Sequence, residues 1–173
     1  MQAIQTVTVG SGGQASIEFT AIPATFTDLK LLVSARTTGT GSAWQLINVL
    51  PNGVTANRSQ RYLAGLGSGV DNTSGNELQA WGSSASSTSN TFGSVAIYIP
   101  NYLSSVAKSL SIDSVTENNA TAALQILTAG FWNDTSAITS LELTLNSGNF
   151  VEHSTATLYG ILAGSDGTTT VTT

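Results

Sequence analysis

The sequence predicts an all-β protein: a jelly-roll-like antiparallel β-sandwich of about 8–10 strands in a single domain. Three observations support this prediction. Apolar and polar residues alternate along most of the chain. The alternating runs are rich in Val, Ile, Thr and aromatic residues, and residues typical of turns separate them. Several runs are long and their connections vary in length, which favours a jelly roll over the more regular immunoglobulin pattern.

The clearest predicted strand is 94–99, where Val95, Ile97 and Ile99 share one face and Ala96 and Tyr98 share the other. Weaker alternation, or a run of β-forming residues, predicts further strands at 16–21, 29–36, 44–50, 61–66, 77–81, 110–113, 122–127, 141–145 and 156–161. Turn residues stand between them, as in Pro51-Asn52-Gly53 and Asn146-Ser147-Gly148. Nothing in these connections has a helical period, so the strands are expected to pack on one another as two sheets.

Three segments are predicted to lie outside the 15–163 sandwich or at its periphery. Residues 1–14 form an arm that ends in glycines, and residues 164–173 form a Thr-rich flexible tail. Two Gly/Ser/Asn-rich loops are expected at 67–76 and 82–90. Within the arm, Ile4, Thr6 and Thr8 alternate with Gln5, Val7 and Val9. This stretch could add to a sheet of a neighbouring copy, which makes Ile4, Val7 and Val9 candidate assembly residues, or it could be the domain's own first strand.

Composition restricts the possible partners. Charged residues make up 9% of the chain, against roughly 25% in an average protein, while hydrophobic residues make up 40%. The net charge is −5 and the five basic residues are scattered, which argues against nucleic acid and against a membrane surface as partners. The chain has no cysteine, so disulfides and thiol chemistry are excluded. Residues 1–9 lack a basic start and a long apolar run, so no signal peptide is expected.

Residues suited to catalysis or to metal binding are few. His153 is the single histidine, and no G-x-S-x-G motif accompanies it. The carboxylates that could form an acid pair, Glu18, Asp113, Glu117 and Glu142, have polar surroundings and are interpreted as solvated groups. Oxygen-rich stretches such as Asn133-Asp134 could hold Ca²⁺, but Asn and Asp are the usual turn residues, and turns are the favoured interpretation. We therefore predict no catalytic residue, no metal ligand and no cofactor.

Aromatic side chains are the best binding candidates in the sequence. Trp44 and Trp132 lie in or next to apolar strands and are predicted to be core residues. Trp81 stands between the two Gly/Ser-rich loops, and Tyr62 lies in a neighbouring predicted strand, so these two are candidate binding residues. A contact between subunits is the favoured interpretation of Trp81, and stacking on a glycan is the alternative.

Five stretches of strand sequence resemble small virion structural proteins of tailed bacteriophages. They are 15–23 (ASIEFTAIP), 27–36 (TDLKLLVSAR), 91–102 (TFGSVAIYIPNY), 109–122 (SLSIDSVTENNATA) and 154–161 (STATLYGI). The resemblance fades between 40 and 90 and includes no catalytic motif. It implies a β-sandwich on the particle exterior that is made in the bacterial cytoplasm. The expected assembly is a homo-oligomer, a trimer, with the major capsid protein or other virion proteins as partners.

Three functions remain open at this point. The expectation is a non-enzymatic capsid decoration, or cement, protein, because the chain starts almost directly with the domain and no fibre shaft precedes it. The alternative is a fibre-tip or receptor- and glycan-binding head domain that uses Trp81 and the loops 67–76 and 82–90. A polysaccharide-degrading enzyme is the third hypothesis, and the single histidine counts against it.

Overall fold

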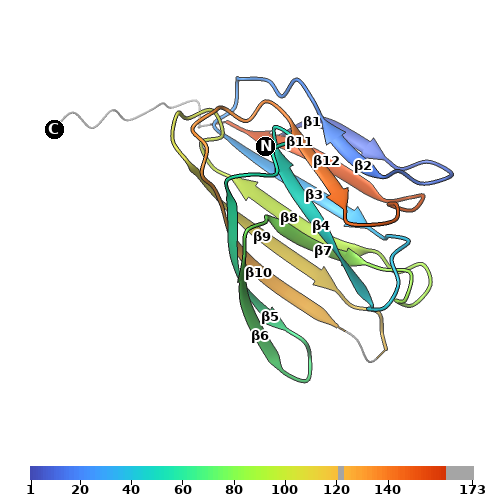
Figure 1. Ribbon diagram of the computed structural model, residues 1–173. Helices are drawn as coiled ribbons and strands as arrows, with labels where there is room; N and C mark the ends of the chain where they lie inside the picture. The colour runs from blue at the N-terminus through green and yellow to red at the C-terminus, as the bar shows by residue number, and fades with distance from the viewer. Residues whose placement is uncertain (121–122, 163–173) are drawn as a thin grey trace.

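The computed structural model describes residues 1–120 and 123–162, and these residues form twelve β-strands in two antiparallel sheets (Figure 1). The strands are β1 (Gln2–Thr8), β2 (Ser16–Phe19), β3 (Asp28–Ala35), β4 (Trp44–Pro51), β5 (Arg58–Gly65), β6 (Val70–Gly75), β7 (Gln79–Ser83), β8 (Gly93–Ile99), β9 (Lys108–Thr116), β10 (Leu124–Trp132), β11 (Leu141–Leu145) and β12 (Thr155–Ile161). The predicted all-β sandwich is confirmed, with more strands than expected. In the described ranges we find no helix that is long and apolar enough to cross a membrane.

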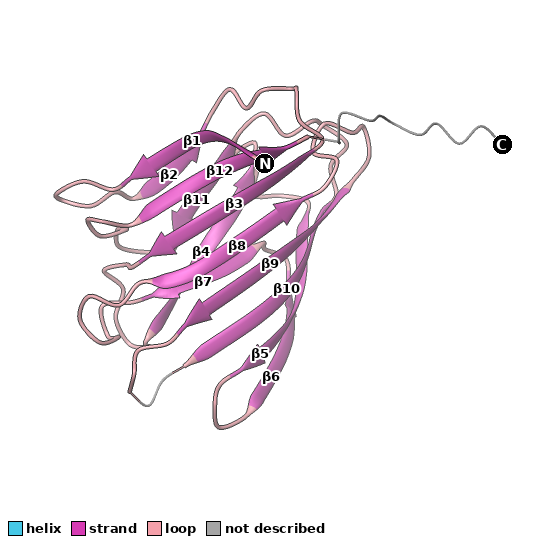
Figure 2. Ribbon diagram, turned by 180° about the vertical axis from the view of Figure 1, so that it is seen from behind, coloured by secondary structure: helices cyan, strands magenta, loops and turns pink. Residues whose placement is uncertain are grey.

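The strand order explains the jelly-roll prediction. The large sheet has the order β1-β12-β3-β8-β9-β10-β5-β6, and the small sheet has the order β2-β11-β4-β7. The first four strands of the large sheet, β1-β12-β3-β8, and the small sheet, β2-β11-β4-β7, are the two four-stranded sheets of a jelly roll. The β9–β10 hairpin and then the β5–β6 hairpin extend the large sheet beyond β8. Figure 2 views the molecule from behind, with the large sheet in front.

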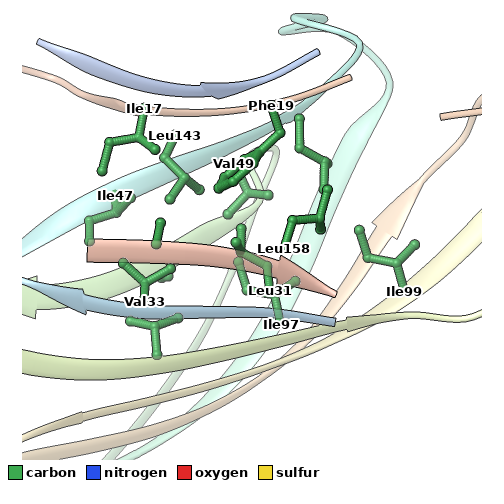
Figure 3. Packing of buried hydrophobic residues seen from close by; sticks show 14 of the residues in the cluster. Ile17, Phe19, Leu31, Val33, Ile47, Val49, Ile97, Ile99, Leu143 and Leu158 are labelled. Carbon is green, nitrogen blue, oxygen red and sulfur yellow. The ribbon is translucent and has the colours of Figure 1, made fainter. Parts of the chain in front are cut away.

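Alternation along the strands separates a buried face from an exposed face. Residues of β9 and β10 alternate strictly between buried and exposed from one end of each strand to the other. From these two strands Leu110, Ile112 and Trp132 join the main core. The rest of this core is formed by buried side chains of β3, β8 and β12, which pack against Ile17, Phe19, Ile47, Val49 and Leu143 of the small sheet (Figure 3). This packing of apolar faces supplies the main driving force for the fold.

A second, smaller core lies at the other end of the large sheet. Ala64 of β5 and Leu124 and Ile126 of β10 pack there against Trp81 of β7, with Trp44 and Tyr62 partly buried around them. Trp81 pairs with Leu46 and lies on the opposite side of its sheet from the inward-facing Ala80 and Ile47. The far end of the large sheet therefore curves around β7, which is the edge strand of the small sheet, and covers it.

Several local expectations are corrected. Residues 67–76 were predicted to be a loop, but Val70–Gly75 form β6, which pairs with β5. In β1 the pairing with β12 shifts between Ala3 and Gln5, and this bulge lets both Ile4 and Val7 pack against the core instead of on opposite faces. Strand β10 extends to Trp132, beyond the predicted end at 127. The predicted tail 164–173 lies outside the described residues.

Candidate binding surfaces

The arm residues belong to the large sheet of their own chain. β1 pairs with β12, Ile4 and Val7 are half-buried, and Val9 is fully buried in the main core. This position corresponds to the first-strand interpretation of the arm, and exchange with a neighbouring copy stays a prediction. Five strands separate β1 from β5, and Trp81 lies on β7 at the far edge of the small sheet, so the arm residues do not meet Trp81 and Tyr62.

The outer face of the large sheet carries apolar side chains that are open to solvent. We call Leu63, Val115, Leu127 and Phe131 the outer strip. Leu63 of β5 lies directly opposite Leu127 of β10, and their side chains are 56% and 54% exposed. Phe131 follows on the same face of β10, and Val115 projects from the neighbouring strand β9. The polar residues next to Leu127 and Val115 in the sequence, Thr128 and Ser114, are buried inside the sandwich.

A shallow hollow of about 650 Å³ lies beside the outer strip and is lined by Leu63, Leu127 and Tyr98. Its charged residues have both signs: Lys30 and Arg61 are cationic and Asp113 is anionic. The Tyr98 hydroxyl donates a hydrogen bond of 2.7 Å to Asp28, and this bond to the carboxylate, with burial and the negative charge of Asp28, raises the pKa of Tyr98. Tyr98 is therefore held in place at the rim of the hollow.

Both ends of the large sheet are open edges. β6 is exposed along five of its six residues, and Val70 at its start is 80% exposed. β1 at the opposite end is exposed except at Ile4 and Val7. β1 contains no charged residue and β6 contains one, Asp71. Natural edge strands usually carry charges or prolines that prevent pairing with another chain, and these two strands carry almost none.

An aromatic cleft lies on the other side of β5. It has a volume of about 450 Å³ and is walled by Trp44 of β4, Tyr62 of β5 and Trp81 of β7. The rings of Tyr62 and Trp81 meet edge to face, with centroids 5.1 Å apart and planes at 72°. Trp81 is 5% exposed, whereas Trp44 and Tyr62 are half-buried and present part of their surface to the cleft. Burial, together with the negative charge of Asp71, raises the pKa of Tyr62.

Glutamine side chains fix the floor of this cleft. Gln60 Nε2 donates to Gln79 Oε1 at 3.0 Å, and the Gln79 backbone N–H donates to Gln60 Oε1 at 2.9 Å. Gln45 Nε2 donates to the carbonyl of Ser147 at 2.8 Å. Gly39 leaves the space that Gln45 occupies, since a Cβ there would lie 1.9 Å from Gln45 Oε1. Gln79 Nε2 also donates to Asn48 Oδ1 of β4 at 3.3 Å, so side-chain amides link the β4, β5 and β7 walls.

The residues considered for catalysis are spread over the molecule. His153 is an exposed turn residue with φ of 72°, and its backbone N–H donates to the carbonyl of Val9. Asp113 lies on the outer face of β9, while Glu117 lies beyond the end of that strand and accepts a hydrogen bond from the Asn119 backbone. Glu18 and Glu142 are directly opposite each other on β2 and β11, so the sheet places these two carboxylates side by side.

The oxygen-rich stretches form turns. Asp134 accepts a hydrogen bond of 2.8 Å from the backbone N–H of Ser136, and this bond lowers the pKa of Asp134. Asn119 adopts a left-handed backbone conformation with φ of 52°. Within residues 1–120 and 123–162, no group of three or more His, Cys, Asp or Glu side chains is placed to hold a metal ion.

From the sequence, Tyr62 and Trp81 were two separate binding candidates, and Trp44 was predicted to be a core residue. The cleft is formed by three strands of two sheets, so no short motif marks it. The signal that could have indicated it is the set of Gln residues at 45, 60 and 79, each in or beside an apolar run. Comparison of the chain with protein-family models, curated proteins and solved structures finds no match.

Proposed function

We propose that the chain is a non-enzymatic assembly protein of a virus particle, whose copies associate through the outer strip into a homo-oligomer. The particular role we propose is capsid decoration: a trimer on the particle exterior that binds the major capsid protein or other virion proteins and stabilises the head. The observation that carries this proposal is the outer strip, a set of exposed apolar side chains on the outer face of β5, β9 and β10.

The physical argument starts from the free energy of exposed apolar surface. Removing apolar surface from water contributes about 25 cal/mol per Å². Leu63 and Leu127 are each more than half exposed and face each other across β5 and β10, so a partner that covers one covers both. A clustered apolar patch on a soluble protein is typical of an interaction site, whereas scattered exposed residues need no explanation.

A second copy of the chain suits this face. The hollow beside the outer strip holds Lys30, Arg61 and Asp113, so copies that turn this face toward a common threefold axis can bring opposite charges together. Homo-oligomers with closed symmetry are also the commonest soluble assemblies. The open edge of β6 lies next to β5, which contributes Leu63 to the outer strip. A neighbouring copy seated there would cover the edge as well as the strip.

The location on a virion is supported by the sequence resemblance to phage virion proteins and by composition. With 9% of its residues charged, the chain loses little hydration energy when Ser- and Thr-rich faces are packed against other proteins. A decoration protein acts by bridging neighbouring capsid subunits, so it needs contact surface and no reacting groups. The outer strip and the two open edges provide such surface on one protein of 17.7 kDa.

The test uses particles that carry the wild-type protein, the Leu127→Asp variant or no copy of it. Leu127 is exposed, so the variant keeps its fold and loses the apolar contact. We expect particles without the protein, and particles offered the variant, to rupture at lower temperature than wild-type particles. Val106→Asp is the matched control, because Val106 is similarly exposed but lies in the connection between β8 and β9 and is not part of the outer strip.

Unchanged rupture temperature together with lost adsorption to host cells would contradict decoration and transfer the role to a fibre tip or receptor-binding head. Rupture that is equally sensitive to Leu127→Asp and Val106→Asp would show that the outer strip is not the contact surface.

A further inference from the structure

The aromatic cleft is separate from the outer strip, and its lining has the chemistry of a ligand site. Its volume of about 450 Å³ lies within the range of small-ligand pockets, about 300–1,000 Å³. Tyr62 and Trp81 are held against each other, and the Gln60–Gln79 amide pair fixes the strands behind them. The site is therefore largely formed in the free protein, which lowers the cost of ordering it around a ligand.

Several polar groups of the cleft keep hydrogen-bonding capacity. The indole N–H of Trp44 and the hydroxyl of Tyr62 form no hydrogen bond with the residues that the structure describes, and the same is true of the Glu77 carboxylate. Asn146 uses its Oδ1 to accept from Asn48 Nδ2 at 2.8 Å, which leaves its own amide N–H groups. The cleft thus offers donors and acceptors on both sides of an aromatic surface.

This combination selects among ligand classes. A pyranose ring has an apolar C–H face, which packs on an aromatic ring, and hydroxyl groups around its edge, which both donate and accept hydrogen bonds. Trp44 and Tyr62 supply the aromatic surface, and Asn146 and Glu77 supply a donor and an acceptor.

Glu77 is the one charged side chain among the described residues that line the cleft. The nearby Arg58 guanidinium, which Glu77 influences, does not line it. An anionic sugar would meet this carboxylate without a compensating cation.

We propose that the aromatic cleft binds a neutral saccharide, with a pyranose ring against Trp44 and Tyr62 and with its hydroxyl groups bonded to Asn146 and Glu77. This proposal is independent of assembly through the outer strip, because the cleft lies on the opposite side of β5. In an oligomer the clefts would be repeated, so that weak binding of single saccharide units would add up along a polysaccharide.

The experiment titrates the full chain with maltohexaose, cellohexaose and laminarihexaose, and with hexagalacturonate as the acidic counterpart, by calorimetry and tryptophan fluorescence. Trp44 is the one partly exposed tryptophan, since Trp81 and Trp132 are buried. We expect saturable binding of at least one neutral hexasaccharide with a blue shift of the emission, and binding of hexagalacturonate at least about tenfold weaker.

Two variants locate the site. Trp44→Ala should weaken binding by about tenfold or more, as truncation of a central aromatic residue does in other interfaces. Tyr62→Phe keeps the packing against Trp81 and removes only the hydroxyl, so it should weaken binding by about three- to tenfold and is informative even if Trp44→Ala does not fold. The control Tyr159→Ala removes a half-buried tyrosine from the outer face of β12, far from the cleft, and should bind like wild type.

Three results would overturn the proposal: no binding of any neutral hexasaccharide, equal binding by wild type and both cleft variants, or tighter binding of hexagalacturonate than of the neutral ligands. None of these outcomes bears on the oligomeric state, so assembly and saccharide binding are tested separately.

Discussion

At the scale of single residues, Arg36 organises the loop between β7 and β8. Its guanidinium donates to the carbonyls of Thr88 and Thr91 at 2.8 and 3.0 Å, and to those of Ser87 and Ala85 at 3.1 and 3.3 Å. A lysine has one ammonium group in place of this planar fork and cannot reach both sides of the loop. The Gly/Ser-rich composition that predicted a loose peripheral loop therefore did not reveal that one side chain holds it.

We expect Arg36→Lys to lower the free energy of unfolding by about 1–3 kcal/mol, because several loop carbonyls lose a charged donor. Limited proteolysis should also cut residues 84–91 faster in the variant. Arg61→Lys is the control, since the exposed Arg61 donates only to the neighbouring carbonyl of Gln60, and its effect should stay within about 0.5 kcal/mol. Equal chemical denaturation curves for Arg36→Lys and wild type would contradict this role of Arg36.

Three tyrosines link stability to alkaline pH. The pKa values of Tyr62 and Tyr102 are raised mainly by burial, and that of Tyr98 is raised mainly by its hydrogen bond to Asp28. The unfolded chain therefore loses these phenol protons first as pH rises. Their contribution to stability is fully present below pH of about 10 and is lost as pH rises through the folded-state pKa values.

The measurement is the absorbance of phenolate in folded and in denatured protein. We expect the folded titration to lie at higher pH than the denatured one, followed by loss of the fold. Burial lowers the pKa of Lys108. This shift acts on stability in the opposite direction, at pH values just below the usual pKa of lysine. Phenolate absorbance separates the tyrosine effect from the lysine effect because it reports tyrosine alone. Coincident titrations in the folded and denatured states would contradict the raised pKa values of these hydroxyls.

At the scale of elements, β10 depends on a close approach between the two sheets. Gly130 is buried, and a Cβ at this position would lie 2.5 Å from Cδ2 of Leu78, which is itself fully buried. We expect Gly130→Ala to destabilise the protein by about 1–3 kcal/mol through overpacking. In β5, by contrast, the nearest atom to a Cβ on Gly65 is 4.0 Å away, so Gly65→Ala should be tolerated. Thermal denaturation that ranks the two variants the other way would contradict this packing.

The elements also show what the sequence could predict. Strand β8 was predicted almost to its ends, because Val95, Ile97 and Ile99 point into the core and the alternating residues do not. Strand β6 was missed because it has one apolar residue and buries almost nothing, and pairing with β5 alone makes it a strand. Strand β9 is longer than predicted because Lys108, Ser114 and Thr116 occupy buried positions, which hides the alternation at its ends.

The aromatic cleft could not be predicted for a different reason. Tyr62 and Trp81 were both selected from the sequence, yet their contact depends on the large sheet curving around β7, and that curvature is a property of the packed sheets. The same curvature buries Trp81 and leaves Trp44 partly open, which reverses the roles that their neighbours in the sequence suggested. The outer strip likewise depends on which face of β5 and β10 is covered.

At the scale of the whole molecule, the jelly roll separates two kinds of surface. The outer strip lies on one face of β5 and the aromatic cleft lies on the other, where β6 contributes Thr73, Ser74 and Gly75 to the cleft lining. A copy that covers the outer strip therefore leaves the cleft open. This arrangement would suit a protein that assembles on a particle and presents its remaining face outward.

The most direct test of self-association through the outer strip is the molar mass of the purified protein in solution, measured by light scattering after size exclusion. We predict a mass of three times 17.7 kDa for the wild type and for Val106→Asp. For Leu63→Asp combined with Leu127→Asp we predict a single folded chain with an unchanged β-sheet circular dichroism spectrum. A monomeric wild type, or a trimer that survives both substitutions, would contradict assembly through this strip.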